Sequence, residues 1–168
     1  MTNAKVIQDA PRAIEVIKNS AQWLVDSGKE NSKWWDPAKL SLNFFCPYAK
    51  ADEFYVLLVD NQPAAAVILQ AKQNMQDWSA VDGSSKPKAL YIHYVAVHRD
   101  FAGQNLVKHL MDFATKLAKK QALQALRLDT NANEPKLCDL YEGLGFKRVK
   151  VLKEEGGATV LYEKRLKQ

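Results

Sequence analysis

A glycine-containing turn between a predicted strand and a predicted helix is the first part of this chain whose residue types could do chemistry. Residues 91–110 read Y-I-H-Y-V-A-V-H-R-D-F-A-G-Q-N-L-V-K-H-L, an apolar, β-branched run followed by Gly103 and an amphipathic segment. The backbone N–H groups at a helix start lack intrahelical partners, and the helix dipole adds partial positive charge there. Such a turn suits phosphate or pyrophosphate, so we expect the chain to bind a phosphorylated ligand here.

The elements that position this turn follow from hydrophobic periodicity and turn residues. We predict helices over 12–27, 104–120 and 135–142, with one or two short helices in the aromatic segment 31–49. We predict strands over 4–9, 54–59, 64–71, 89–98, 125–129, 146–152 and 159–165. Turns are expected at 60–63 and 155–157, and 72–88 is interpreted as a surface loop. This pattern predicts a single α+β domain.

The composition is that of a soluble globular protein. The 168 residues are 47% apolar and 26% charged, with no apolar run near the ~20 residues needed to span a membrane. The first residues show no signal-peptide block, so we expect a cytoplasmic location. Cys46 and Cys138 have neither metal-ligand spacing nor the density of a disulfide scaffold, so we expect both thiols to be reduced and no metal to be bound.

The net charge of +5 raises the question of nucleic acid. The lysines are spread along the chain, and Lys116, Lys119 and Lys120 alternate with apolar positions on one predicted helix, as on a solvated helix face. No nucleic-acid-binding motif accompanies them. We therefore expect no nucleic-acid partner, and we note that a positive balance also favours an anionic cofactor.

The order strand, turn, helix, strand and then L-Y-E-G-L-G-F at 140–146 resembles the GNAT superfamily of coenzyme A-dependent N-acetyltransferases. The later family segment typically reads Asn, a short helix, and Leu-Tyr-Glu-x-x-Gly-Phe. The resemblance implies one N-acetyltransferase domain over 1–168, with a mixed, mostly antiparallel central sheet flanked by helices. It also implies acetyl-coenzyme A as co-substrate and a primary amine of a small molecule or protein as acceptor.

The turn departs from the family pattern Arg/Gln-x-x-Gly-x-Gly/Ala. Asp100 stands where Arg or Gln is usual, Asn105 where Gly or Ala is usual, and Ala102 where a second form of the loop has Arg. The family binds pyrophosphate mainly through backbone N–H groups, and Asn tolerates unusual backbone angles near a helix start. The alternative is a non-catalytic module that binds and senses coenzyme A through a degenerate loop.

By resemblance, the cofactor contacts fall on two parts of the chain. The strand before the loop would hold the pantetheine arm and the acetyl carbonyl, with the Val97 N–H as the carbonyl donor. The asparagine of the later segment corresponds to Asn133, with Asn131 as a rival. The cofactor-binding residues are therefore expected to be Val95, Ala96, Val97, Ala102, Gly103, Gln104, Asn105, Leu106, Val107, Asn131, Asn133 and Tyr141.

Two residues are candidates for proton transfer. Tyr141 matches the family tyrosine whose hydroxyl faces the coenzyme A sulfur, and a phenol can protonate a departing thiolate of similar basicity. His93 lies where polyamine-acetylating relatives carry a glutamate, and an imidazole titrating near neutral pH suits removal of an ammonium proton. Strand alternation would place its side chain on one face with Val95 and Val97. A core tyrosine and a satisfied strand histidine are the alternatives.

Aromatic residues lie where family members build the acceptor-binding wall. Stacking or cation–π contact with an amine would suit them, although aromatics in weakly periodic segments are often core residues. The expected acceptor-binding residues are Trp34, Trp35, Phe44, Phe45 and Trp78. The sequence does not name the acceptor, and the C-terminal hairpin offers an edge that could pair with a second copy in a homodimer.

Overall fold

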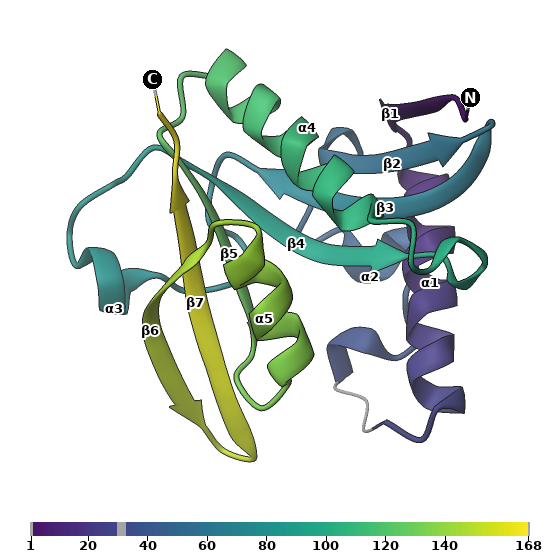
Figure 1. Cartoon of the computed structure of the whole chain (residues 1–168). Helices are drawn as coiled ribbons and strands as arrows, with labels where there is room; N and C mark the ends of the chain where they lie inside the picture. The colour runs from purple at the N-terminus through teal and green to yellow at the C-terminus, as the bar shows by residue number, and fades with distance from the viewer. Residues whose placement is uncertain (1, 30–32, 168) are drawn as a thin grey trace. The chain divides into compact units, whose positions relative to one another are not determined.

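The computed structural model describes residues 2–29 and 33–167 (Figure 1). The chain forms two compact units. Unit 1 comprises residues 1–69 and 94–110, and unit 2 comprises residues 70–93 and 111–168. Strand β4 (Ala89–Val97) and helix α4 (Leu106–Lys120) each contribute residues to both units. The extent of one domain over 1–168 stays a prediction.

Unit 1 contains a sheet with strand order β1-β2-β3-β4. Strand β1 (Ala4–Gln8) pairs antiparallel with β2 (Phe54–Val59), and β2 pairs antiparallel with β3 (Gln62–Gln70). The β2–β3 turn consists of Asp60 and Asn61, whose positive φ angles of 48° and 66° are those of a tight hairpin turn. The turn is thus shorter than the predicted 60–63, because Gln62 and Pro63 already belong to β3.

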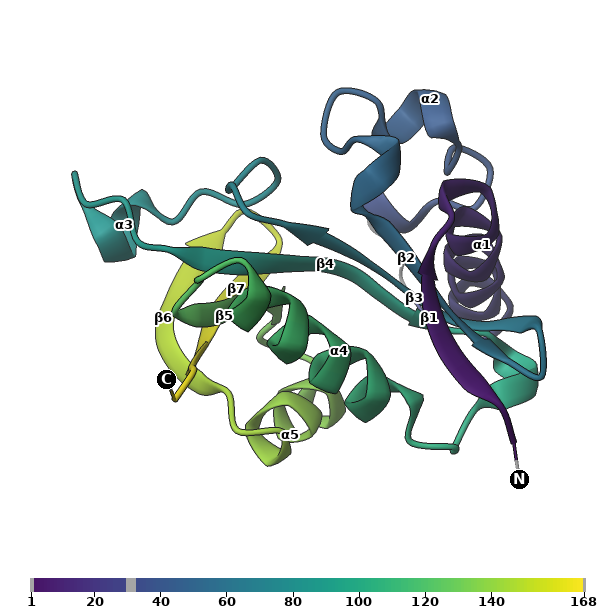
Figure 2. The same ribbon diagram turned by 90° about the horizontal axis from the view of Figure 1, so that it is seen from above.

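Helix α1 (Ala10–Asp26) covers the β1–β3 strands on one face (Figure 2). The Asp9 side chain caps its first turn by accepting a hydrogen bond from the Arg12 N–H at 3.0 Å. Ala13, Val16 and Ile17 are fully buried at the spacing of one helix face. The helix predicted for 12–27 from its apolar periodicity is confirmed.

The aromatic segment of unit 1 forms short helical turns, as predicted for 31–49, although residues 31 and 32 lie outside the described part. These are η1 (Lys33–Trp35) and α2 (Leu42–Phe45), and η2 (Ala51–Glu53) follows before β2. Ser41 caps α2 by accepting a hydrogen bond from the Phe44 N–H at 3.2 Å.

Unit 2 contains strands in the order β4-β5-β7-β6. Strand β5 (Ala125–Asn131) pairs parallel with β4, with Ala89 opposite Ala125 and Ile92 opposite Leu128. Strands β6 (Lys147–Glu154) and β7 (Gly157–Arg165) form the antiparallel C-terminal hairpin, and β7 also pairs antiparallel with β5. Helix α5 (Pro135–Gly143) contacts β5 and β6. The predicted α+β class with a mixed, mostly antiparallel sheet is confirmed.

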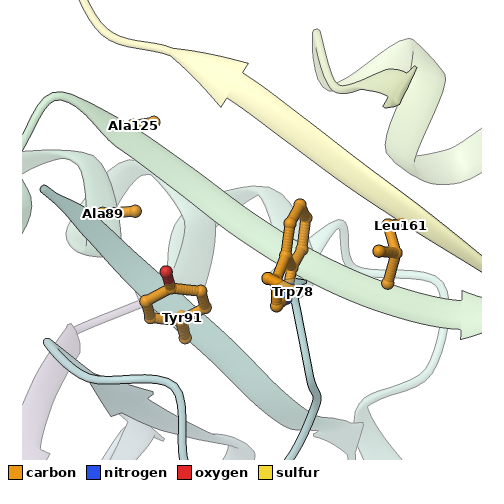
Figure 3. Packing of buried hydrophobic residues seen from close by; sticks show 5 residues of the cluster. All are labelled: Trp78, Ala89, Tyr91, Ala125 and Leu161. Atoms are coloured by element: carbon orange, nitrogen blue, oxygen red, sulfur yellow. The ribbon is translucent and has the colours of Figure 1, made fainter. Parts of the chain in front are cut away.

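The core of unit 2 includes a buried cation. Trp78, Ala89, Tyr91, Ala125 and Leu161 pack together (Figure 3). The Arg127 guanidinium lies 4.3 Å from the Trp78 ring centroid and donates two hydrogen bonds to Asp82, at 2.7 and 2.9 Å. Its Nε donates a third to Glu163 at 2.8 Å. These partners satisfy a charge that would otherwise be costly to bury.

The connection at 72–88 is therefore not a plain surface loop. It contains the short helix α3 (Ser79–Asp82), and Arg127 attaches this helix to the sheet through Asp82. Trp78 is 1% exposed. The expectation that Trp78 binds an acceptor is wrong for this structure, because its ring packs in the core of unit 2 beneath the Arg127 guanidinium.

Within the described residues, no helix combines the length and the apolar character needed to cross a membrane.

Candidate active site

The turn after β4 in unit 1 has the backbone expected of an anion-binding loop. Gly103 and Asn105 both have left-handed φ angles, 81° and 59°, directly before α4 begins at Leu106. Alternation of left- and right-handed residues forms a concavity of backbone N–H groups. The first-turn N–H groups of Leu106 and Val107 have no intrahelical acceptor. The prediction that Asn105 tolerates an unusual backbone angle is confirmed.

Gly103 stands next to open space. A Cβ atom added there would meet no described atom within 4 Å, so the glycine is required by its φ angle and not by close packing. Residues 102–105 are exposed. The surface of the loop beside Gly103 is therefore open.

The side chains beside this loop are directed elsewhere. The Arg99 guanidinium stacks on Trp23 of α1 at 3.8 Å, and the Arg99 backbone N–H donates to Asn19 Oδ1 at 2.9 Å. Asp100 is 83% exposed, with one carboxylate oxygen 3.7 Å from His98 Nδ1. The loop is thus attached to α1 through η3 (Arg99–Phe101), an anchorage that no sequence motif indicated.

Strand β4 has an irregular backbone at Tyr94. Its φ angle is +52°, in the left-handed region where a bulky non-glycine residue is rare. Such a residue interrupts the pleat, as in a β-bulge. The expectation that His93 shares a face with Val95 and Val97 therefore no longer follows from strand alternation. The sequence carried no signal for this feature, because glycine or asparagine would normally mark it.

The Tyr94 side chain joins an aromatic cluster within unit 1. Its hydroxyl donates to the Trp34 carbonyl oxygen at 2.6 Å, and its ring lies 4.9 Å from those of Trp35 and Phe45. Trp34 makes edge contacts with Phe44 at 6.3 Å and with Tyr48 at 5.4 Å.

The members of this cluster differ in exposure. Trp34 is 41% exposed, whereas Phe45 is 1% exposed and packs on Phe54 at 5.3 Å. The expected acceptor contact by Phe45 is therefore wrong, because the ring is a core residue. Trp35 and Phe44 are half-buried.

His93 is the buried polar residue of β4 in unit 2. Its side chain is 6% exposed, and Nδ1 lies 3.9 Å from Asp129 Oδ1 on β5. Burial lowers the pKa of His93 to about 4. The imidazole is thus neutral at pH 7, and the expectation that it titrates near neutral pH is wrong, because desolvation disfavours the cation.

Asp129 was missed by sequence reasoning, although it stands at the end of the predicted strand 125–129. Burial first, and then the carboxylate of Glu154, raise the pKa of Asp129 to about 6. Its side chain is 28% exposed. At pH 7 this pair consists of a neutral imidazole and a carboxylate.

Tyr141 projects from α5 into the interior of unit 2. It is 7% exposed and its ring makes an edge contact with Phe146 at 6.0 Å. Burial, and then the Asp129 carboxylate, raise the pKa of Tyr141 above its ordinary value. The hydroxyl therefore keeps its proton at neutral pH and is a weaker acid than a free phenol.

Other residues of the segment 140–146 around Tyr141 have structural roles. Glu142 Oε1 accepts hydrogen bonds from the Tyr162 hydroxyl and from Arg148 Nε, both at 2.8 Å. Gly145 has a φ of 93° and ends the helix, with the Phe146 N–H donating to the Tyr141 carbonyl at 3.0 Å. These contacts hold the segment that carries Tyr141.

The two candidate asparagines are also distinguishable. Asn131 Oδ1 accepts a hydrogen bond from the Asn133 N–H at 2.9 Å, so Asn131 caps its own loop. Asn133 is exposed.

Within the described part of the chain, no group of three or more His, Cys, Asp or Glu side chains could hold a metal ion.

Comparison with known proteins gives a consistent assignment. The model of the acetyltransferase (GNAT) family matches residues 20–146. The uncharacterized N-acetyltransferase YesJ of Bacillus subtilis (strain 168) is 25% identical over 142 residues, covering 84% of this chain and 78% of YesJ.

Solved structures agree in fold. A GNAT-family acetyltransferase from Listeria monocytogenes 4b F2365 superposes with a TM-score of 0.72 at 25% identity, over 97% of this chain and 95% of that one. The PaiA N-acetyltransferase of Thermoplasma acidophilum, solved in complex with coenzyme A, superposes with a TM-score of 0.68 at 17% identity, over 98% and 99%.

Proposed function

Because the chain belongs to the acetyltransferase (GNAT) family, we propose that it transfers an acetyl group directly from acetyl-coenzyme A to a primary amine of a small molecule or protein. The observation that supports acetyl-coenzyme A as co-substrate is the backbone conformation of the loop before α4. Gly103 and Asn105 are left-handed and the helix start follows, an arrangement suited to pyrophosphate. The similar fold of PaiA, solved with coenzyme A, supports the same choice.

Residues 102–107 would hold the pyrophosphate through backbone N–H groups, and Val95, Ala96 and Val97 would hold the pantetheine arm. Asn131 and Asn133 are proposed as further contacts. A backbone cradle explains how Asp100 and Ala102 can replace the usual basic residues. Asp100 is largely exposed beside His98, so its charge is screened by solvent.

Acetyl-coenzyme A supplies an acyl group activated as a thioester. Tyr141, whose hydroxyl keeps its proton at neutral pH, would donate that proton as the thiolate departs. His93 is neutral at pH 7 and would accept the proton of the amine at Nε2. The Val97 N–H is proposed as the donor to the acetyl carbonyl oxygen.

The acceptor is proposed to contact Trp34, Trp35 and Phe44. One observation favours an ammonium group on this surface: Lys33 Nζ already lies 5.2 Å from the centroid of the Trp34 ring. A second ammonium could take this cation–π position if the Lys33 side chain moved into solvent. Amines that carry an aromatic or apolar group would gain further contact with the exposed Trp34.

The test is a panel of amines incubated with acetyl-coenzyme A, with thiol release and acetylated product measured together. We expect transfer to at least one primary amine, and a rise in melting temperature with coenzyme A alone. A thermal shift without transfer to any amine would favour a coenzyme A-sensing module. No thermal shift at saturating coenzyme A would remove the co-substrate assignment.

A further inference from the structure

The buried Nε2 atom of His93 is a polar atom that the fold itself does not use. His93 is 7% exposed, and among the described residues Nε2 has no hydrogen-bond partner. Buried polar groups are nearly always paired, so an exception calls for a ligand, a water or a chemical role. The other ring nitrogen faces Asp129 Oδ1 at 3.9 Å.

The strand register explains why these two residues meet. In the parallel pairing of β4 with β5, Ile92 stands opposite Leu128. His93 and Asp129 are the next residues of their strands, so their side chains leave the same face of the sheet. Two further titratable groups interact with Asp129. Glu154 from β6 raises the pKa of Asp129, and the Asp129 charge in turn raises the pKa of Tyr141 from α5.

We propose that Asp129 is a positioning residue for His93, with its carboxylate orienting the imidazole so that the lone pair of Nε2 accepts the proton of the acceptor amine. This inference rests on the proposed acetyl transfer. An ionised carboxylate only accepts hydrogen bonds, so it favours the tautomer with the proton on Nδ1 and leaves Nε2 as the acceptor. The 3.9 Å separation is about 1 Å longer than a hydrogen bond, and such contacts often tighten when ligands bind.

The proton balance of the step is simple. An ammonium N–H bond breaks, an Nε2–H bond forms, and the positive charge moves from the amine to the imidazole. The Asp129 carboxylate stays ionised and offsets that charge. The freed amine electron pair is then available to attack the thioester carbonyl, and the imidazolium later returns its proton to solvent.

The first test needs no acetyl transfer. The tautomer of the His93 ring is determined by NMR from its 15N chemical shifts at pH 7, in the wild-type protein, in D129N and in D129E, with His98 and His109 as internal controls. The Asp129 carboxylate is ionised at this pH, so the wild-type ring should carry its proton on Nδ1, D129N should lose that preference, and D129E should restore part of it. A proton on Nε2 in wild type, or the same tautomer populations in wild type and D129N, would overturn the proposal, whatever the enzyme does.

The second test is a double-mutant cycle on kcat/KM over a range of pH. We expect D129N to lower kcat/KM by roughly 10-fold, and to have no further effect in the H93Q background, because Asp129 acts through His93. D129E should recover part of the rate. Additive losses would show that Asp129 acts independently and would overturn the proposal. If wild type transfers no acetyl group, the proposed function fails, and the NMR measurement of the His93 tautomer still decides the His93–Asp129 contact.

Discussion

The loop before α4 in unit 1 and the pair His93–Asp129 in unit 2, both proposed as functional, are built in two different ways. The loop is exposed and made of backbone, with left-handed residues at Gly103 and Asn105. The pair is largely buried and made of side chains, with pKa values displaced in opposite directions. Tyr141, also in unit 2, is likewise a buried side chain with a displaced pKa.

The difference explains which departures from a family pattern a chain can tolerate. A site made of N–H groups depends on φ and ψ angles, so Asp100 and Ala102 can replace basic residues if the chain still turns in the same way. A site made of side-chain atoms depends on single functional groups in a low-dielectric interior, where each missing partner is expensive. The predictions below separate these two cases.

The largest effect is expected at Tyr141. Tyr141→Phe removes one oxygen and should lower kcat by roughly 10²-fold with coenzyme A affinity unchanged, since the proton donor is lost and the packing is kept. Steady-state kinetics and a coenzyme A thermal-shift titration measure the two quantities. Tyr55→Phe, at another buried tyrosine, is the matched control and should leave kcat unchanged. Unchanged turnover in Tyr141→Phe would make this tyrosine a packing residue.

The stability of the folded chain should respond to pH through the same pair. The pKa of His93 falls from 6.5 to about 4 on folding, so its contribution to the free energy of unfolding increases as the pH rises from 4 to 6.5. The pKa of Asp129 rises from 3.8 to about 6, so its contribution decreases as the pH rises through 4 to 6. In the wild type these two contributions oppose each other over nearly the same range.

Single substitutions should expose each contribution. Between pH 4 and 6.5 the free energy of unfolding of D129N should rise by roughly 2 kcal/mol more than that of wild type. H93Q should show the opposite trend. Denaturant unfolding at several pH values measures both. Parallel pH profiles for all three proteins would show that the pair is not coupled to folding.

A smaller effect, on coenzyme A affinity, is expected at the loop before α4. Gly103→Val places a β-branched side chain at a φ of 81°, which costs about 1–2 kcal/mol and should weaken coenzyme A binding by roughly 10-fold or more. Gly156→Val is the matched control, because Gly156 has a φ of 85° and equally open surroundings in the β6–β7 turn. Calorimetric titration with coenzyme A compares them. Equal affinities in the two variants would count against a backbone cradle at Gly103.

The smallest effect is expected at a side chain that supports unit 1. Tyr94→Phe removes the 2.6 Å hydrogen bond to the Trp34 carbonyl, worth about 1 kcal/mol, and should raise KM for the amine roughly 5-fold with kcat unchanged. Kinetics with an aromatic and an aliphatic amine measure this. A fall in kcat at constant KM would instead place Tyr94 in the chemical step.

Several elements could be predicted because their signals are local. Helix α1 follows from apolar spacing, and α5 follows from Pro135 at its start and from Gly143 and Gly145 at and after its end. The Leu-Tyr-Glu-x-x-Gly-Phe segment identified the family, which the family model confirms. The left-handed angle at Asn105 was also foreseeable, since asparagine is among the few residues that adopt it readily.

The remaining features depend on partners that are distant in the chain. The positive φ of Tyr94 has no residue-type signal, and it occurs where the hydroxyl meets Trp34, 60 residues earlier. From the sequence, Trp78 and Asp82 were interpreted as residues of a surface loop. In the structure both pack against Arg127, which lies on a later strand.

By itself, the sequence determined the element order, the turn before α4 and the family, because periodicity, caps and turn residues act over a few positions. Only the tertiary structure decided that Phe45 and Trp78 are core residues, that His93 is neutral at pH 7 and that Asp129 faces it. Burial and the approach of charges set those properties, and both arise when segments far apart in the chain pack together.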